Sequence, residues 1–564
     1  MKTKEADHPQ FPRESVAIWS ESRLTNFAIL SSHFILLAIL YFQTFSFGYV
    51  FYDDWEYLGG NPQILSGFSF DNIKWAFSTL YFYNWHPITW LSYMLDASLF
   101  DADPGWAHIH NALLHGLNGL LVYVFLLKLS ASRWSAYIMS IIFLVHPLHV
   151  ESVAWIAERK DLLCAFFFLL GLILYDTYRR LPSRKYYLGI LLSYTLALLA
   201  KPMAVTFPVV LLMLDFFVYR NDFRLDSSSL KSSILRFNYL KALIEKMPML
   251  ALSLASSIIT IIAQDDALVS LKLHTIGERW VISTSAYSTY LKQFFAPIDL
   301  AAFYPLPLGN TSIIESTSLT GMVTPTLTLV AIGAVALMMF RKFPLVIAGF
   351  CFFLITLLPV IGIVQVGGQL HADRYMYIPS IGALIACIYL PTSLNQRFLR
   401  LTNALVVIFT MYLTVICYWQ VSYWESRYTL FSRVLNVSGP NYVAHMQLGS
   451  AYLDLKMSEE ARLQFLDAIA LAPLNPEPYR GMGNVAILDK DFASAEGLYR
   501  MAFERNHPDS VQLYIGFGVS LAEQGKLDLA AEAFEKAISI EPTSVEAKEK
   551  LKLYLQNHNQ DQSL

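Results

Sequence analysis

The sequence predicts an all-α protein in which a membrane domain of many helices precedes a short array of helical repeats. Three observations lead to this prediction. Hydrophobic residues make up 55% of the 564 residues and charged residues only 15%, whereas soluble domains carry about 25% charge. Long apolar runs recur along most of the chain, and the C-terminal region is polar and periodic.

The first apolar run, 24–48, is long enough to span about 30 Å of hydrocarbon. No small-residue cleavage site follows it, so we expect an anchor and not a removed signal peptide. Further runs bring the expected number of crossings to eleven: 107–128, 134–145, 162–178, 186–200, 203–219, 248–263, 321–340, 343–364, 375–390 and 401–419. The run 278–295 is interrupted by Arg279 and Lys292, which favours an interfacial helix.

The basic residues of the short loops predict the topology. Arg133, Arg179, Arg180, Arg184 and Lys185 all fall on one side of the expected crossings, which is then cytoplasmic. Residues 1–23 become a cytoplasmic tail of a protein in the inner (cytoplasmic) membrane, and the region after the last crossing lies outside, in the periplasm. The net charge of −3 and the lack of basic-aromatic spacing argue against nucleic acid as a partner.

The C-terminal region contains an internal repeat. Glycines recur at intervals of 34 and 35 residues, in register with an aromatic position: Gly449, Gly483 and Gly518 with Phe465, Tyr499 and Phe534. This is the tetratricopeptide pattern, in which small residues let two antiparallel helices touch and an aromatic ring fills the gap. We therefore expect a membrane domain over 24–435, three repeats over 440–542, and a capping helix and tail over 543–564.

Two adjacent carboxylates, Asp53 and Asp54, stand where the first apolar run ends, in "FYDDWEYLGGNP". Carboxylates gain nothing from the headgroup region, so a helix exit alone does not explain them. Further ionisable residues gather on the same predicted side: His86, His146, His149, Glu151, Arg159, Lys201, His371, Asp373 and Arg374. Their gathering at one surface, and not near the midplane, favours an enzyme over a transporter.

Transfer from a lipid-phosphate donor needs this combination of groups. A carboxylate takes the proton from an acceptor hydroxyl as that oxygen attacks the anomeric carbon, while cationic side chains hold the departing phosphate. The phosphate leaves without a protonating acid.

Four segments carry a resemblance to a known family: "FYDDWEYLGGNPQI", "HPLHVESVAWIAERKDLL", "KPMAVTFPVVLLMLD" and "ADRYMYIPSIG". Followed by tetratricopeptide units, they resemble the transmembrane and tetratricopeptide repeat-containing O-mannosyltransferases and their prokaryotic relatives, which are GT-C glycosyltransferases. The resemblance implies a GT-C-like membrane domain, a polyprenyl-phosphate-linked sugar donor and an acidic base in the first external loop. That base is Asp53 or Asp54; we favour Asp53, with Asp54 orienting the acceptor or an ion.

The remaining candidates receive roles on the same basis. Arg374, Lys201 and Arg159 would hold the donor phosphate, and six residues would contact substrate: Glu151, His146, His149, His86, Asp373 and His371. Simpler explanations compete with these roles. The two aspartates could be solvated carboxylates at a helix exit, Arg374 an interfacial anchor and Lys201 a snorkelling lysine. The charged residues of "HVESVAWIAERKD", which are Glu151, Glu158, Arg159, Lys160 and Asp161, could form a structural ion-pair cluster. The histidine spacing fits no helical zinc motif, so no metal ligand is assigned; a divalent cation stays an open alternative.

These observations predict an inverting glycosyltransferase that moves a hexose such as mannose to a hydroxyl acceptor, with protein Ser/Thr as one candidate, on the outer face of the membrane. The repeats would recruit the acceptor protein or glycan. The chain has fewer repeats than the animal members usually have, so the acceptor could also be another glycan or a lipid. Two alternatives stay open: a ligase or polymerase of lipid-linked glycans, and a non-enzymatic scaffold anchored in the membrane.

Overall fold

The structure, a computed structural model, divides into two compact units, Met1–Ser426 and Arg427–Leu564. It describes residues 23–129, 131–219, 239–264, 275–306, 326–327, 330–331, 333–334, 343–363, 369–389, 396–505, 510–542 and 544–561. Within these residues all regular secondary structure is helical, apart from one isolated β-bridge between Pro305 and Gln369. The predicted all-α class is confirmed. Most of the predicted tail 1–23 and of the predicted crossing 321–340 lies outside the described residues.

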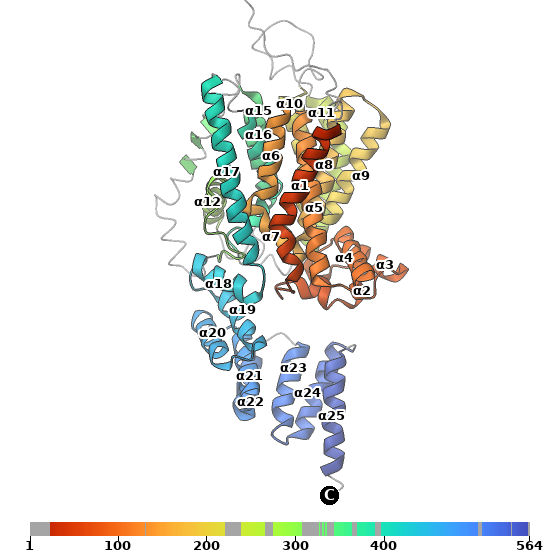
Figure 1. Cartoon of the computed structure of the whole chain (residues 1–564). Helices are drawn as coiled ribbons and strands as arrows, with labels where there is room; N and C mark the ends of the chain where they lie inside the picture. Colours follow the sequence, from red (N-terminus) through yellow and green to blue (C-terminus); the bar gives the residue numbers. More distant parts are fainter. Residues whose placement is uncertain are drawn as a thin grey trace, which may run out of the picture. The chain divides into compact units, whose positions relative to one another are not determined.

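Four helices of the first unit, α1, α5, α6 and α17, lie side by side, and α1 contacts each of the other three (Figure 1). Their bounds are Arg23–Tyr41, Pro104–Lys128, Arg133–Val145 and Gln396–Ser422. Ser132 caps the start of α6 by accepting a hydrogen bond from the Ser135 N–H, because the first turn of a helix has no intrahelical acceptors for its N–H groups.

A second group of seven helices completes the main helices that the structure describes in this unit. This group comprises α8 (Arg159–Arg180), α9 (Arg184–Ala200), α10 (Phe207–Phe217), α11 (Tyr239–Ala263), α12 (Ile276–Phe295), α15 (Pro344–Leu357) and α16 (Pro379–Tyr389). The helix α8 contacts both α5 and α9. Its 22 residues correspond to about 33 Å at 1.5 Å per residue, close to the thickness of the hydrocarbon core.

Short helices gather where α8 begins and α9 ends. They are η1 (Phe42–Ser46), η2 (Trp55–Gly59), α2 (Pro62–Leu65), α3 (Phe70–Ser78), η3 (Tyr81–Tyr83), α4 (Pro87–Phe100), η4 (Pro147–His149), α7 (Val150–Ala154), η5 (Ile156–Glu158), η6 (Pro202–Thr206), η10 (Leu358–Val360) and η11 (Asp373–Met376). Proline residues begin four of these helices, because proline has no N–H to leave unpaired and its φ suits a first turn. This end of the unit carries most of the predicted site residues.

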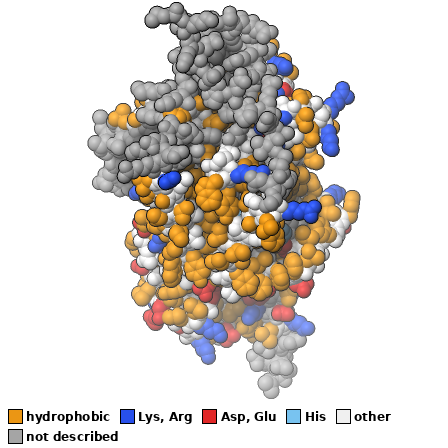
Figure 2. Space-filling model, turned by 45° about the horizontal axis from the view of Figure 1, so that its top comes forward, with side chains coloured by type: hydrophobic (Ala, Val, Ile, Leu, Met, Phe, Trp, Pro, Cys, Tyr) orange, Lys and Arg blue, Asp and Glu red, His pale blue; other side chains and the backbone are white. Residues whose placement is uncertain are grey.

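Five described helices are long and apolar enough to cross a membrane, or six if the bent pair Arg133–Val145 and Pro147–Ala154 forms one span. Several apolar side chains on these helices face outward, among them Phe27 and Ile35 of α1 and Ile408 and Met411 of α17. Figure 2 shows hydrophobic side chains spread over much of the visible face. Such surface is typical of contact with lipid, and the exact number of crossings stays a prediction.

The second unit is a row of antiparallel helix pairs preceded by α18 (Arg427–Ser438), which packs on α19. The pairs are α19 (Tyr442–Asp454) with α20 (Ser458–Leu471), α21 (Glu477–Leu488) with α22 (Phe492–Glu504), and α23 (Val511–Ala522) with α24 (Leu527–Ile540). A last helix, α25 (Val545–Asp561), packs on α24. A Cβ on Gly483 would lie 2.9 Å from the Tyr499 ring, so this position requires glycine for the pair to close.

Candidate functional site

The acidic segment is held in an uncommon backbone conformation. Asp53 has φ 95° and Phe51 φ 50°, in the left-handed region that costs most L-residues about 1–3 kcal/mol. Asp54, next in the chain, stands at the start of η2. Neighbouring side chains in this segment therefore do not simply alternate between two faces as in an extended strand, and the two carboxylates have different surroundings.

The Asp54 carboxylate is fully buried and braces the segment. Its Oδ2 accepts a hydrogen bond from the Val50 N–H at 3.1 Å, and its Oδ1 accepts one from the Ala157 N–H at 3.0 Å. Burial raises the pKa of Asp54 to about 7, against the effect of these two hydrogen bonds. Both oxygens thus serve to fix the acidic segment against η5.

The Asp53 carboxylate is less buried than Asp54. Burial raises its pKa to about 7; Lys160 and Arg374 lower it, and Glu158 raises it. No described side chain donates a hydrogen bond to this carboxylate. A carboxylate that titrates near neutrality and keeps free lone pairs can accept a proton from a substrate.

Glu158 joins three cations that come from separate parts of the chain. Its oxygens lie 3.0 Å from Lys201 Nζ, 3.1 Å from Lys160 Nζ and 3.3 Å from Arg374 Nε. Two of these cations, Lys201 and Arg374, are distant from Glu158 in sequence. Lys201 also lies 2.6 Å from Asp161, so it is held at the site.

Arg374, on η11, is fixed from several sides. Its backbone N–H donates to Glu151 Oε2 at 2.8 Å, its Nη1 pairs with the other oxygen of Glu151, and its Nη2 donates to Gln369 at 3.1 Å. The guanidinium carbon lies 5.3 Å from the centre of the Trp155 ring. Glu151 raises the pKa of Arg374 well above its usual value despite burial, so this cation is permanent.

Arg159 faces a different part of the unit. Its guanidinium donates to Asn111 at 2.7 Å and to the carbonyls of Ala107 at 3.0 Å and Ser92 at 3.2 Å, and it pairs with Asp96 at 2.5 Å. All its nitrogens have protein partners, and the side chain is fully buried. This arrangement joins α4 and α5 to the start of α8.

The predicted histidines fall into two groups. The nitrogens of His146 contact the Phe294 carbonyl at 3.0 Å and the Leu148 N–H at 3.2 Å. The nitrogens of His149 contact the Phe143 carbonyl at 2.7 Å and Ser380 Oγ at 2.9 Å. These two rings are satisfied within the protein.

His86 and His371 are buried, and neither has a hydrogen-bond partner on either nitrogen among the described residues. The His371 ring stacks on Tyr304 at 4.0 Å between centroids, and burial lowers its pKa to about 4. Asp373 accepts a hydrogen bond from the Tyr304 hydroxyl at 2.9 Å, and its pKa is raised by burial and by Glu151.

Lys160 and Tyr57 also belong to the site, and neither is among the site residues predicted from the sequence. Lys160 Nζ donates to the Tyr57 hydroxyl at 3.3 Å and lies 4.5 Å from the centre of its ring. The signal for Lys160 was its place between Glu158 and Asp161 in "ERKD", where charged residues are unusual next to an apolar run. The part of the chain that the structure describes contains no group of three or more His, Cys, Asp or Glu side chains that could hold a metal ion.

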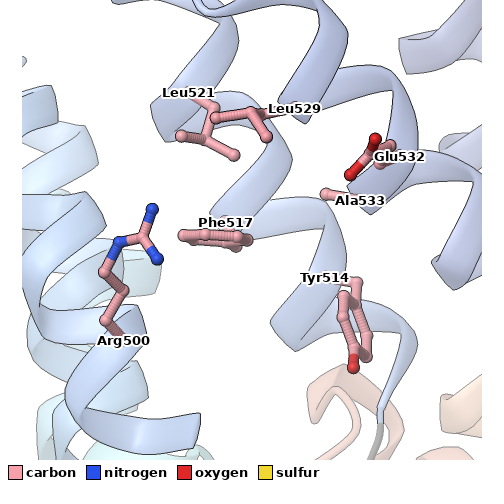
Figure 3. A pocket seen from close by; sticks show the side chains of 7 residues that line it. All are labelled: Arg500, Tyr514, Phe517, Leu521, Leu529, Glu532 and Ala533. Atoms are coloured by element: carbon pink, nitrogen blue, oxygen red, sulfur yellow. The ribbon is translucent and has the colours of Figure 1, made fainter.

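The repeat unit carries a hollow of its own, of about 260 Å³. It is lined by residues of α22, α23 and α24, and Figure 3 shows the Arg500 guanidinium pointing toward the Phe517 ring. The guanidinium carbon lies 5.3 Å from the centre of that ring. The lining combines aromatic and aliphatic side chains with one base and one acid.

Comparisons with known proteins match both units. Two family models, each described as tetratricopeptide repeat, match residues 442–473 and 481–545. A solved structure of the first tetratricopeptide domain of human RPAP3 is 21% identical, covers 22% of this chain and 95% of that one, and gives a TM-score of 0.21. The family models confirm the predicted repeats.

Relatives named as protein O-mannosyl-transferases cover most of the chain. F38B6.6 of Caenorhabditis elegans is 26% identical over 69% of this chain and 54% of its own length. TMTC3 of Mus musculus is 21% identical over 81% of this chain and 57% of its own length. TMTC3 of Homo sapiens is 22% identical over 81% of this chain and 54% of its own length. The chain thus matches little more than half the length of these relatives, which confirm the resemblance drawn from the four motifs.

Proposed function

We propose that this chain is a membrane glycosyltransferase that moves a hexose, mannose by analogy with its named relatives, from a polyprenyl-phosphate-linked donor to a protein hydroxyl at the outer face of the membrane. One observation carries the proposal: a carboxylate that titrates near neutrality, Asp53, lies beside a buried group of cations gathered on Glu158. The apolar helices and the O-mannosyl-transferase names of the relatives support it.

Asp53 would act as the general base. Its carboxylate takes the hydroxyl proton as the acceptor oxygen attacks the anomeric carbon from the side opposite the phosphate. The new carbon–oxygen bond forms while the bond to the phosphate oxygen breaks, and that oxygen leaves with the electron pair. The anomeric configuration is therefore inverted. A pKa of about 7 suits this step, because a base is most effective when its pKa is near the working pH.

Arg374 and Lys201 would hold the leaving phosphate. Glu158 contacts both cations, so their spacing is set before a donor binds, and such preorganised charge favours the state in which negative charge develops. The planar guanidinium of Arg374 is also suited to two-point contact with phosphate oxygens. Arg159 is fully buried and already binds four protein oxygens in a different part of the unit, so we leave it out of the phosphate group.

The opposite end of α8 supports the assignment of the site to the outer face. There, Arg179 pairs with Glu245 at 2.7 Å and with Asp215 at 3.0 Å, and Arg180 pairs with Asp176 at 2.9 Å. These arginines belong to the loop that the positive-inside rule places in the cytoplasm. A helix that begins at the candidate site and ends at cytoplasmic arginines would put the site outside.

The repeat unit would recruit the acceptor protein, as tetratricopeptide arrays expose surfaces for other proteins. Ending the chain at Ser426, the limit of the first unit, tests this role. Transfer to a protein acceptor should be lost, whereas binding of the lipid donor should be retained. A scaffold without enzymatic activity would bind no donor in either form.

The central test is the substitution of Asp53 by Asn in the purified full chain, supplied with mannosyl polyprenyl phosphate and a Ser/Thr-containing acceptor protein. Release of free polyprenyl phosphate should fall at least about a hundredfold, a usual loss for a missing general base. Asp71→Asn is the matched control, because Asp71 is an exposed carboxylate on α3. Equal activity of Asp53→Asn and Asp71→Asn would refute the proposed function.

A further inference from the structure

Beside Asp53 lies a second polar group that the proposed steps do not use. It consists of Tyr57, Asn84, His86 and Lys160, and we call it the Tyr57 cluster. Tyr57 is on η2, Asn84 and His86 immediately precede α4, and Lys160 is in the first turn of α8. Three separate segments therefore meet at one point next to the proposed base.

The Tyr57 hydroxyl accepts two hydrogen bonds, from Asn84 Nδ2 at 3.2 Å and from Lys160 Nζ at 3.3 Å. These bonds use both lone pairs of its oxygen. No described residue accepts the proton of this hydroxyl, although the side chain is fully buried. A buried phenol normally donates its proton to a partner, so the hydroxyl is prepared to donate to a ligand.

His86 has the same property in stronger form. It is 2% exposed, and neither ring nitrogen forms a hydrogen bond of good geometry with the described residues. The ring stays neutral, because burial together with Lys160 and Lys201 lowers its pKa well below 6.5, while Glu158 and the Trp85 carbonyl oppose this only in part. A neutral imidazole offers one donor and one acceptor. Leaving both unpaired in a buried place is costly unless a ligand completes them.

The segment that carries His86 is also held under strain. Phe82 and Tyr83 have φ of 54° and 60°, the left-handed region that L-residues rarely adopt, and such conformations concentrate at ligand sites. Aromatic rings surround the cluster: the Tyr57 ring centroid lies 4.8 Å from that of Trp90 and 5.9 Å from that of Phe82. Mixed donors and acceptors beside aromatic rings match a sugar, whose hydroxyls both donate and accept and whose C–H groups pack on rings.

We propose that the Tyr57 cluster binds the sugar ring of the lipid-linked donor through its hydroxyl groups. This inference rests on the proposed function. The donor sugar is favoured over the acceptor because Lys160 connects the two groups: its Nζ lies 3.3 Å from the Tyr57 hydroxyl and 3.1 Å from Glu158, the residue that joins the cations that would face the phosphate. The sugar is bonded to that phosphate and has to lie within one ring of it.

Two lipids test the proposal with the purified full chain: mannosyl polyprenyl phosphate, and polyprenyl phosphate without sugar. Tyr57→Phe removes only the hydroxyl, and His86→Phe removes both ring nitrogens while keeping an aromatic ring. Each variant should weaken binding of the mannosyl lipid about threefold to tenfold, as expected for one or two lost hydrogen bonds, and leave the Kd of the sugar-free lipid unchanged. Tyr194→Phe is the matched control, since its buried hydroxyl contacts Ser253 at 2.5 Å between α9 and α11.

Each outcome decides. Equal weakening of both lipids, or no weakening of either, overturns the sugar subsite, as does a variant that changes only the KM for the acceptor. If the unchanged protein binds neither lipid, the proposed function itself fails. If it binds both and transfers mannose, but Tyr57→Phe and His86→Phe behave like Tyr194→Phe, only the subsite fails. Unchanged binding of the sugar-free lipid also shows that a variant is folded.

Discussion

The pH dependence of transfer should follow the ionisation of Asp53. Burial and Glu158 raise the pKa of this carboxyl from 3.8 to about 7, while Lys160 and Arg374 oppose them. Only the ionised form can accept a proton, so the rate rises with pH. One pH unit below the pKa about a tenth of the molecules carry the charge, and one unit above it about nine-tenths do. We therefore expect kcat/KM to fall about tenfold from pH 8 to pH 6.

The substitution Lys160→Met tests the cause of this pKa. Lys160 is the strongest opposing charge acting on Asp53, so its removal disfavours the ionised form and raises the pKa. The rising limb should then move to higher pH. A shift of one unit, which corresponds to about 1.4 kcal/mol, would lower the ionised fraction at pH 7 from about a half to about a tenth and the rate about fivefold.

The assay measures the initial rate of polyprenyl phosphate release at low donor concentration between pH 5.5 and 9. Asp71→Asn serves as the control and should reproduce the unchanged profile. Asp54 has a pKa of about 7 as well, so the limb reports the two neighbouring carboxyl groups together. A rate that does not change between pH 5.5 and 8, or a Lys160→Met profile displaced to lower pH, would refute the reasoning.

Three further substitutions probe other parts of the structure. Arg374→Lys keeps a charge but loses the planar fork, so the Kd for polyprenyl phosphate should rise about tenfold or more in a direct binding assay; an unchanged Kd would exclude Arg374 from the phosphate site. Asp54→Asn places an amide N–H₂ against one of two backbone N–H groups, such as that of Ala157. The free energy of unfolding should therefore fall by about 1–3 kcal/mol, which is measured as a lower Tm. An unchanged Tm would contradict the bracing role of Asp54. Gly483→Ala puts a methyl group 2.9 Å from the Tyr499 ring. It should destabilise the repeats by about 1–3 kcal/mol, measured by thermal unfolding, and leave donor binding unchanged. A repeat unit of unchanged stability would show that the ring can shift freely.

The sequence predicted those features that depend on local pattern. The apolar run 107–128 corresponds to α5, Pro104–Lys128, because a long apolar stretch bounded by proline and lysine leaves little choice of structure. The register of the repeats predicted that Gly483 and Tyr499 contact each other, as the structure shows. The pair of aspartates also marked the segment that carries the candidate base.

Contacts between distant segments could not be read in this way. Arg159 and Lys160 are neighbours, yet about 100° of helical rotation separates their side chains, and no polar stripe in this apolar helix indicates which of them faces Asp53. The structure turns Arg159 toward Asn111 and Lys160 toward Tyr57. The contacts of Glu158 with its three cations depend on tertiary packing in the same way. The periodicity of the sequence carries no information about that packing.

The Asp54 brace has a consequence for how a bulky lipid could enter and leave. By binding the N–H groups of Val50 and Ala157, it ties the acidic segment to η5, which directly precedes α8, so we expect the two to move as one body. Any rearrangement that opens a path for the isoprenoid tail therefore keeps the distance from Asp53 to Lys160 nearly constant. Residues 81–86 lie outside this body, so mutations there could change the preferred sugar during evolution while the proton-transfer geometry is preserved.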